Sequence, residues 1–295
     1  MNGTSAPVSH PLKDTGTELV AEADGVELMR YVYRPEMPAF EGSKPYFHPL
    51  RTPAGDVVTA YRPHDHRWHK GLQMTVSHLS GQNFWGGVSY VRERGYADLP
   101  NVGTMRHEEF TSPGRERLTW HTQAGEHWVD EVRELAVRDT EDDSWALDFS
   151  TSITNVRGEP LRFGSPTTEG RLMAGYSGLF WRGPRSFADG RVIAADGQGG
   201  PEMMGRTASW LAYTGEHDEV DRASTLLFLA APGTTWFVRT TPFAAVNPSL
   251  AFFEEVELPA GATLRHRYRV VVADGAWDRD RLEAYVRAHP LEVRP

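Results

Sequence analysis

Apolar and polar residues alternate along almost every patterned segment of this chain, and this period of two restricts the fold more than any other feature. From Trp145 to Ile153, the odd-numbered positions hold Trp, Leu, Phe, Thr and Ile, while small or polar residues fill the even positions. Successive side chains of a β-strand point to opposite faces of the sheet, so this pattern predicts a strand with one buried face. Similar patterns predict strands at 26–32, 72–78, 118–122, 128–132, 172–182, 209–214, 225–230, 236–240, 250–256 and 263–273.

The C-terminal segment alone has the pattern of a helix. Asp278 is its predicted N-cap, and Leu282, Tyr285 and Val286 fall on one helical face. The expected strands follow one another roughly every 8–12 residues, and no strand–helix–strand rhythm occurs. The chain is therefore predicted to form an all-β, single-domain sandwich over residues 18–295 with a short C-terminal helix. Residues 1–17, rich in Gly, Thr, Ser and Pro, are expected to be a flexible tail.

The composition excludes several classes of function. The formal net charge of −9 disfavours binding to nucleic acid or anionic membranes, since both need a cationic face. The absence of cysteine excludes disulfides, thiolate metal sites and cysteine nucleophiles. No secretory signal pattern occurs near the N-terminus, and the longest apolar run, 226–231, is far shorter than the ~20 residues of a membrane helix. The sequence thus predicts a soluble cytoplasmic protein with no nucleic-acid or membrane partner, and leaves open whether it forms a homo-oligomer.

Histidine, arginine and aromatic residues are concentrated in the segment 46–85. Five of the twelve histidines lie there, three of them in the run His64-Asp65-His66-Arg67-Trp68-His69-Lys70. This run lacks the aliphatic residues of a packing strand. Imidazoles titrate near neutral pH and bind metals, so such a cluster indicates acid–base catalysis, metal ligation or anion binding. The segment is the predicted location of the functional site.

Two arrangements of these histidines are open. His64 and His66 share a face if the segment is extended, and a turn between them and His69 would bring in the third imidazole. The three histidines, with His48 or Glu169 as a further ligand, would then suit zinc or iron with an open coordination position. In the metal-free alternative, a neutral imidazole accepts a proton while Arg67, Lys70 or Arg171 stabilises the developing oxyanion. Glu169 and Arg171 share a strand parity, either as a pair that holds the ligand or as a structural ion pair.

Motifs spread over nearly the whole chain resemble a bacterial family named after the methane monooxygenase subunit PmoA. They include His48-Pro49-Leu50, the segment 64–71, Asn83-Phe84-Trp85-Gly86, Glu169-Gly170-Arg171, Gly178-Leu179-Phe180-Trp181-Arg182 and Trp236-Phe237-Val238-Arg239. The oxygenase subunit is a membrane protein and this chain has no membrane-spanning pattern, so the name implies no oxygenase activity. The resemblance implies instead a protein similar to those of sugar catabolism.

A second resemblance is to the galactose-mutarotase-like β-supersandwich. Thr154-Asn155-Val156 and Phe163-Gly164 resemble the strand pair before the mutarotase active-site histidine, and Pro259-Ala260-Gly261 resembles the turn before that fold's last long strand. The resemblance implies a supersandwich whose concave face binds sugar rings, with the His64–Lys70 segment opening onto that face. Glu169 stands near the place of the mutarotase histidine, and no carboxylate occupies the place of its basic glutamate. Ordinary mutarotation is therefore not expected.

The resulting prediction is an enzyme that moves a proton on a small-molecule carbohydrate: a sugar, keto-sugar or glycoside, as an epimerase, isomerase, lyase or hydrolase. Its catalytic group is predicted to be His64, His66 and His69 facing Glu169 across one pocket, as acid–base partners or as ligands of one metal. The alternative is a non-catalytic carbohydrate-binding or sensing protein, which needs aromatic platforms but no titrating imidazoles. The predicted substrate-binding residues are His48, Arg51, Arg67, Lys70, Asn83, Trp85, Arg171 and Trp181.

Overall fold

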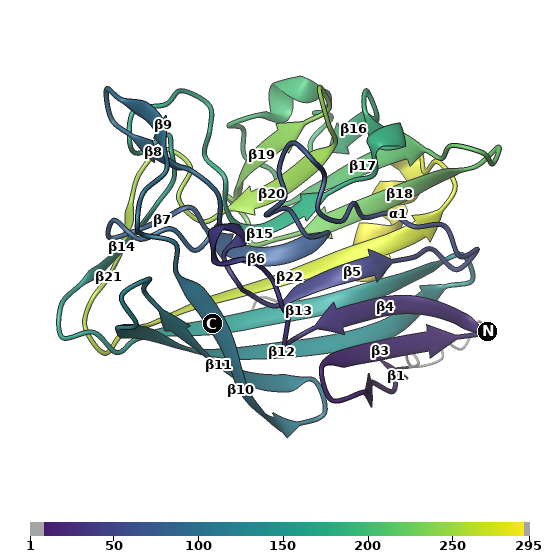
Figure 1. The fold of residues 1–295 in the computed structure, drawn as a ribbon. Helices are drawn as coiled ribbons and strands as arrows, with labels where there is room; N and C mark the ends of the chain where they lie inside the picture. The colour runs from purple at the N-terminus through teal and green to yellow at the C-terminus, as the bar shows by residue number, and fades with distance from the viewer. Residues whose placement is uncertain (1–8, 292–295) are drawn as a thin grey trace.

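The alternating segments form the antiparallel strands of two large sheets in the computed structural model, which describes residues 9–291 (Figure 1). Sheet A has nine strands in the order β10 (Thr104–Ser112), β11 (Arg115–His121), β12 (His127–Glu141), β13 (Ser144–Asn155), β22 (Thr263–Asp274), β18 (Ala223–Leu229), β17 (Trp210–Glu216) and β16 (Arg191–Ala194), with β1 (Ser9–His10) paired to β12. Sheet B has eight strands in the order β19 (Thr235–Arg239), β20 (Ala245–Ser249), β15 (Ser177–Arg182), β6 (Leu72–Val76), β5 (Tyr46–Leu50), β4 (Val26–Val32), β3 (Glu18–Ala23) and β2 (Lys13–Asp14).

Short elements complete the described chain. One small sheet contains β21 (Val256–Leu258), β14 (Leu161–Gly164) and β7 (His78–Leu79), and another contains β8 (Ser89–Val91) and β9 (Gly95–Ala97). Both lie at one end of the molecule, at the left of Figure 1. The 3-10 helices are η1 (Ala39–Glu41), η2 (Arg185–Phe187) and η3 (Pro201–Met203), and the α-helix is α1 (Arg279–Ala288).

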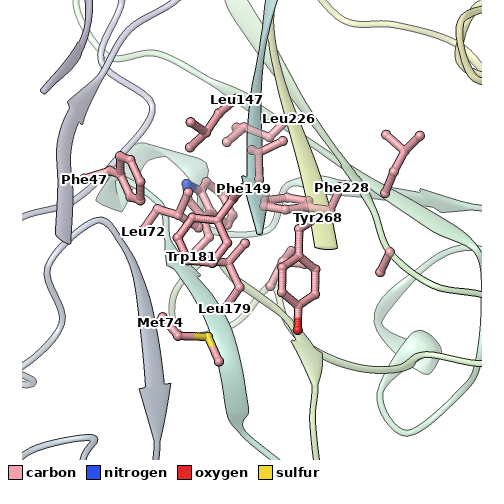
Figure 2. Close-up of a cluster of buried hydrophobic side chains, with 14 of the residues drawn as sticks. Phe47, Leu72, Met74, Leu147, Phe149, Leu179, Trp181, Leu226, Phe228 and Tyr268 are labelled. Atoms are coloured by element: carbon pink, nitrogen blue, oxygen red, sulfur yellow. The ribbon is translucent and has the colours of Figure 1, made fainter. Parts of the chain in front are cut away.

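The hydrophobic core lies between the two large sheets, because each sheet turns one face of its alternating side chains inward. Burying a large apolar side chain contributes about 1.5–3 kcal/mol, so this layer is the main source of stability. Figure 2 shows the part of the core to which sheet B contributes Phe47, Leu72, Met74, Leu179 and Trp181 and sheet A contributes Leu147, Phe149, Leu226, Phe228 and Tyr268.

The predicted fold class is confirmed: the protein is an all-β sandwich with one short C-terminal helix. The side chain of Asp278 accepts a hydrogen bond from the Arg281 backbone N–H at 2.9 Å, which is the expected N-cap. Leu282 and Tyr285 are buried on the inner face of α1. Long periodic segments were predictable because their pattern spans many residues.

Two predicted strands are wrong in part. Residues 172–176 precede β15 as a loop, and residues 250–255 form bends between β20 and β21. In residues 165–171, which lead from β14 into the first of these loops, Thr168 Oγ accepts from the Ser165 N–H at 3.1 Å and the Gly170 N–H donates to the Thr167 carbonyl at 2.9 Å. These turn contacts withdraw the backbone from any sheet, and they also overturn the expected strand parity of Glu169 and Arg171.

The first residues also differ from the expected tail. Residues 1–8 lie outside the described residues, whereas β1 pairs with β12 and β2 pairs with β3. The His10 ring contacts the Asp139 carboxylate at 2.5 Å, which fixes this segment to sheet A. Among residues 9–291, no helix has both the length and the apolar character that crossing a membrane requires.

Candidate functional site

The outer face of sheet B, which points away from the core, carries a second group of aromatic side chains. Along β15, Leu179 and Trp181 belong to the core, while Phe180 between them packs with Trp85 and Phe237 on the opposite face. Along β19, Trp236 and Val238 face the core, and Phe237 and Arg239 take the other parity. The strand alternation therefore sends Trp181 inward, where it is 0% exposed. Trp181 was predicted to bind substrate, but it is buried in the core and does not line the cavity on this face.

The His-rich segment folds over this outer face as a closed loop. The Ala60 N–H donates to the Arg182 carbonyl, the Arg182 N–H donates to the Gly71 carbonyl, and the Gly71 N–H donates to the Ala60 carbonyl, at 2.7–2.9 Å. Gly71 has a φ of +61°, and an added Cβ would lie 2.2 Å from the Phe47 carbonyl oxygen, so only glycine fits where the loop closes. This closure attaches the loop to the end of β15.

Turns inside the loop bring two of the three histidines together. The His66 N–H donates to the Pro63 carbonyl, and the His69 N–H donates to the His66 carbonyl. The rings of His66 and His69 consequently stack with centroids 4.7 Å apart. The turn that the sequence required for His69 to join the cluster is present. His64 is exposed instead, and its Nδ1 accepts from Arg185 at 2.7 Å.

A buried ion pair holds the base of the loop. Lys70 is 0% exposed and contacts the carboxylate of Glu41, which is 2% exposed and also accepts from Arg62 at 2.6 Å. Burial opposes ionisation of Glu41, but the hydrogen bonds and charges of Arg62 and Lys70 outweigh it and lower the pKa of this carboxyl. Lys70 is thus committed to Glu41 and does not face a ligand, contrary to the prediction.

An aromatic cavity of about 390 Å³ lies between this loop, β15, β19 and the 165–176 loop. Its volume falls at the lower end of the about 300–1,000 Å³ typical of small-molecule sites. Most of its wall is aromatic, with two imidazoles and two guanidinium groups among the rings. It is lined by His66, Trp68, His69, Trp85, Val88, Tyr96, Arg171, Tyr176, Phe180, Phe237, Arg239, Pro242 and Phe243.

Trp85 is held in the cavity wall by two buried polar residues. Asn83 Oδ1 accepts from the N–H groups of Trp85 and Gly86, and its Nδ2 donates to the Gly87 carbonyl and to Ser89 Oγ. Lys44 Nζ donates to the Trp85 carbonyl at 2.7 Å, and burial lowers its pKa to about 7. Trp85 keeps its predicted place in the site, whereas Asn83 uses its amide to shape the turn and does not bind a ligand directly.

The two histidines of the cavity have different hydrogen-bond partners and therefore different tautomers. His66 Nδ1 lies 2.8 Å from Asp65 Oδ2. Burial opposes ionisation of Asp65, but the bond to His66 and the charge of Arg182 lower its pKa, so the carboxylate accepts and the proton is on His66 Nδ1. His69 Nδ1 lies 3.2 Å from Arg182 Nη1, which can only donate, so the His69 proton is on Nε2.

Burial also fixes the charge of His69. Its side chain is 3% exposed, and burial first, then the charges of His66, Arg182, Lys44 and Lys70, hold its pKa well below the usual range. His69 is therefore neutral at physiological pH. In the described part of the chain, neither His66 Nε2 nor His69 Nε2 has a hydrogen-bond partner, so the first is available as an acceptor and the second as a donor.

The arginines of the cavity were predicted only in part. Arg171 was expected at the site and lines it, with its guanidinium 4.9 Å from the Tyr96 ring centroid. Arg239 was not predicted, although it is the last residue of the motif Trp236-Phe237-Val238-Arg239. Strand alternation places Arg239 on the outer face of the sheet together with Phe237, and this parity could have indicated its position. Arg182 lies behind His69, with its guanidinium 3.6 Å from the Phe243 ring centroid.

The remaining predicted binding residues lie outside the cavity lining. His48 Nδ1 contacts Thr59 Oγ at 2.9 Å, its ring stacks on Tyr61, and burial lowers its pKa to about 4. Arg51 forms a β-bridge with Val57 beyond β5, and Arg67 is exposed on the loop. The sequence predicted these residues because they lie next to the His-rich motif. In the closed loop, however, they do not lie on the side that borders the cavity.

Glu169 forms a different group from the predicted one. Its carboxylate lies 3.5 Å from His78 Nε2, and Glu255 lies 4.0 Å from the same nitrogen. The pairing of Gly164 in β14 with His78 in β7 brings these residues together. The possible ligand atoms of His78, Glu169 and Glu255 all lie within 4.8 Å of one another, so this trio could hold a metal ion. Within residues 9–291, His64, His66 and His69 do not form such a group. No ion pair joins Glu169 to those three histidines among the described residues.

Comparison with known proteins identifies the family. The model of a family of unknown function, DUF6807, matches residues 18–287, so the chain belongs to this family. The resemblance to the PmoA-like family remains a prediction from the sequence. No curated protein matches the chain.

Several solved structures are similar to the chain at low identity. A heparan sulfate lyase HepC mutant from Pedobacter heparinus shares 10% identity at a TM-score of 0.41, over 91% of this chain and 37% of that one. The GH36 α-galactosidase AgaB from Geobacillus stearothermophilus shares 12% at 0.44, over 92% and 41%. An α-galactosidase from Lactobacillus brevis shares 9% at 0.41, over 98% and 42%. This chain thus spans less than half the length of these proteins, and no argument below rests on them.

Proposed function

For this member of the DUF6807 family, we propose that the aromatic cavity is the active site of an enzyme that transfers a proton on a sugar or keto-sugar. His66 is the general base, Asp65 fixes its tautomer, and His69 is a neutral hydrogen-bond donor. The observation that carries the proposal is the pairing of the Asp65–His66 contact at 2.8 Å with a stacked second imidazole 4.7 Å away. The two rings have opposite free functions, which suits one step of proton abstraction.

The proposed reaction is a proton transfer that passes through an enediolate. His66 Nε2 removes the proton from a carbon next to the ligand carbonyl, and the electron pair of that C–H bond moves onto the carbonyl oxygen. The resulting enediolate oxygen accepts a hydrogen bond from His69 Nε2. Because His69 is neutral, it donates this bond without having to carry a buried positive charge. Protonated His66 then returns its proton to the neighbouring carbon, which was the carbonyl carbon, while the proton of the adjacent hydroxyl moves to the former carbonyl oxygen. The product is an isomer in which the carbonyl has moved by one carbon. The positive charge that His66 carries meanwhile is stabilised by Asp65.

The cavity wall supports a sugar-like ligand. Trp68, Trp85, Tyr176 and Phe237 present ring faces and edges around a space of about 390 Å³. The negative face of an aromatic ring attracts the partly positive C–H groups of a sugar, as it attracts the edge of another ring. A non-catalytic binding protein would use the same wall, but it gains nothing from an imidazole whose tautomer is fixed by a carboxylate.

The proposal is tested by following C–H signals of sugars and keto-sugars in D₂O by proton NMR, which reports proton abstraction whatever the product. His66→Gln should lower the exchange rate about 100-fold or more while leaving affinity within about threefold. The matched control is His64→Gln, in the same loop but outside the cavity, which should exchange at the wild-type rate. If the wild type binds sugars but exchanges no proton and converts none, the proposal fails and the binding protein is the better description.

A further inference from the structure

Two guanidinium groups line the aromatic cavity without a carboxylate partner. Arg239 lies on β19 with its guanidinium 5.4 Å from the Phe237 ring centroid, and Arg171 donates a hydrogen bond to the Tyr96 hydroxyl. That hydroxyl also lies 2.7 Å from the Tyr176 hydroxyl. In residues 9–291, no ion pair is formed by Arg171 or Arg239. Both are neither buried nor fully exposed.

Other arginines near the cavity have acidic partners. Arg62 reaches Glu41 at 2.6 Å, and Arg182 and Arg185 reach Asp65 at 3.6 and 3.5 Å. Burial, and secondarily the charge of Arg171, lowers the pKa of Arg239, which shows that the two cations repel one another inside a partly desolvated wall. Partly buried charges without a counter-charge are unfavourable, so an anion placed between them would be bound with a gain in free energy.

A row of aromatic rings connects the imidazoles with Arg171 along the cavity wall. Ring contacts lead from His69 to Trp85 at 5.5 Å and from Trp85 to Tyr176 at 4.5 Å, and Tyr176 then meets Tyr96. A ligand of sugar size would therefore have its reacting carbon at one end and a second polar group at the other.

We infer that the ligand of this cavity is an anionic sugar, whose oxyanion is held by Arg171 and Arg239 while its carbon skeleton lies on the aromatic wall. The inference rests on the proposed function for the position of the reacting carbon. A carboxylate and a phosphate share the required chemistry, because both accept paired hydrogen bonds from the planar guanidinium fork. Anion binding at one end would also orient the ligand so that a fixed carbon faces His66.

The inference is tested by calorimetric titration of the full chain with matched probes: D-glucose, D-glucuronate and D-glucose 6-phosphate, and the corresponding galactose series. At least one anionic probe should bind about tenfold or more tightly than its neutral partner, and the tighter of the acid and the phosphate identifies the source of the oxyanion. Arg239→Gln should weaken that probe about 10- to 100-fold and leave the neutral sugar unchanged. Arg171→Gln is the second variant, for the case that Arg239→Gln does not fold.

The control is Arg117→Gln, which removes the same charge from an exposed ion pair with Glu109 and should leave the preference intact. Equal affinity for neutral and anionic probes, no binding of any anionic probe, or a preference that survives both cavity variants would overturn the inference. The proposed function can fail while the inference about the ligand holds. This is the outcome if anionic sugars bind through Arg239 but no sugar exchanges a proton through His66. If neutral sugars bind equally well and exchange depends on His66, only the anionic preference falls.

Discussion

The outer faces of the two sheets are both hollowed, and the hollows differ in how their charges are matched. On sheet A a groove of about 450 Å³ is larger than the aromatic cavity on sheet B. In the groove, Asp148 lies 2.6 Å from Arg269, 3.1 Å from Arg138 and 4.0 Å from Arg267. In the cavity, Arg171 and Arg239 face aromatic rings and no carboxylate of the described residues.

The difference is one of charge matching and not of size, and it leads to different expectations for the two hollows. The partly buried cations of the groove are already paired with Asp148, so an anion bound there must replace an existing contact and gains little. Arg265, which also lines the groove, forms no ion pair among the described residues but is exposed, so its charge is already solvated. A cavity whose cations have no counter-charge has a higher free energy when it is empty, and an anionic ligand supplies the missing negative charge. The groove on sheet A is therefore expected to serve stability, and the cavity on sheet B to serve binding and catalysis.

Removing the anion of the groove should have the largest effect on stability. Asp148→Asn withdraws the carboxylate that Asp148 offers to Arg269, and both residues are less than a tenth exposed. The free energy of unfolding should fall by about 3 kcal/mol, because one half of a buried pair loses its partner. Urea unfolding measures this, with Arg239→Gln as the cavity counterpart, which should cost less than about 1 kcal/mol since it relieves repulsion. Equal losses in the two variants would remove the distinction between the hollows.

Acid should weaken the protein through buried histidines in both hollows. His266 lines the groove and has its pKa lowered by burial to about 4, and burial also holds the pKa of His69 in the cavity well below its usual range. Since the folded pKa lies below the unfolded value of about 6.5, the unfolded chain binds the proton first. The contribution of these histidines should thus be constant above pH 6.5, and stability should fall as the pH drops from 6.5 towards 4, by up to about 3 kcal/mol for His266.

The measurement is urea unfolding at a series of pH values for the wild type and His266→Gln. The variant should lose part of the acid dependence in this window and keep its ligand affinity at neutral pH. An unchanged slope between pH 6.5 and 4 would show that His266 is not held neutral by burial.

Substitution of Glu169 should have the smallest effect on turnover. The carboxylate contacts His78 at 3.5 Å and lies outside the cavity lining, so Glu169→Gln should change the exchange rate by less than about threefold. If Glu169 were the acid–base partner that the sequence predicts, the loss would be about 100-fold or more. A loss of that size, measured by the same D₂O exchange, would move the reactive centre from His66 and His69 to the group of His78, Glu169 and Glu255.

The sequence predicted the sandwich and the segment that borders the candidate site, but only part of the lining of that candidate site. His66, His69, Trp85 and Arg171 were predicted because their residue types stand out against a packing strand. Trp181 was misassigned because the face of a strand depends on register, which one sequence does not fix. The role of Arg239 depends on which carboxylates the fold leaves out of reach, and the contact of Glu169 with His78 depends on pairing between β14 and β7. These are long-range properties that no local pattern contains.

The central claim, that the ligand site is the unmatched cavity and not the matched groove, is tested most directly by mapping where a ligand binds. In a nitrogen-15 NMR titration with the sugar acids and sugar phosphates named above, the indole N–H resonances of Trp68 and Trp85 should shift and saturate together with the backbone amide of Phe243. The amides of Ser150 and Arg267, which line the groove, should not move. Saturable shifts confined to the groove, with the two indoles unchanged, would contradict the account.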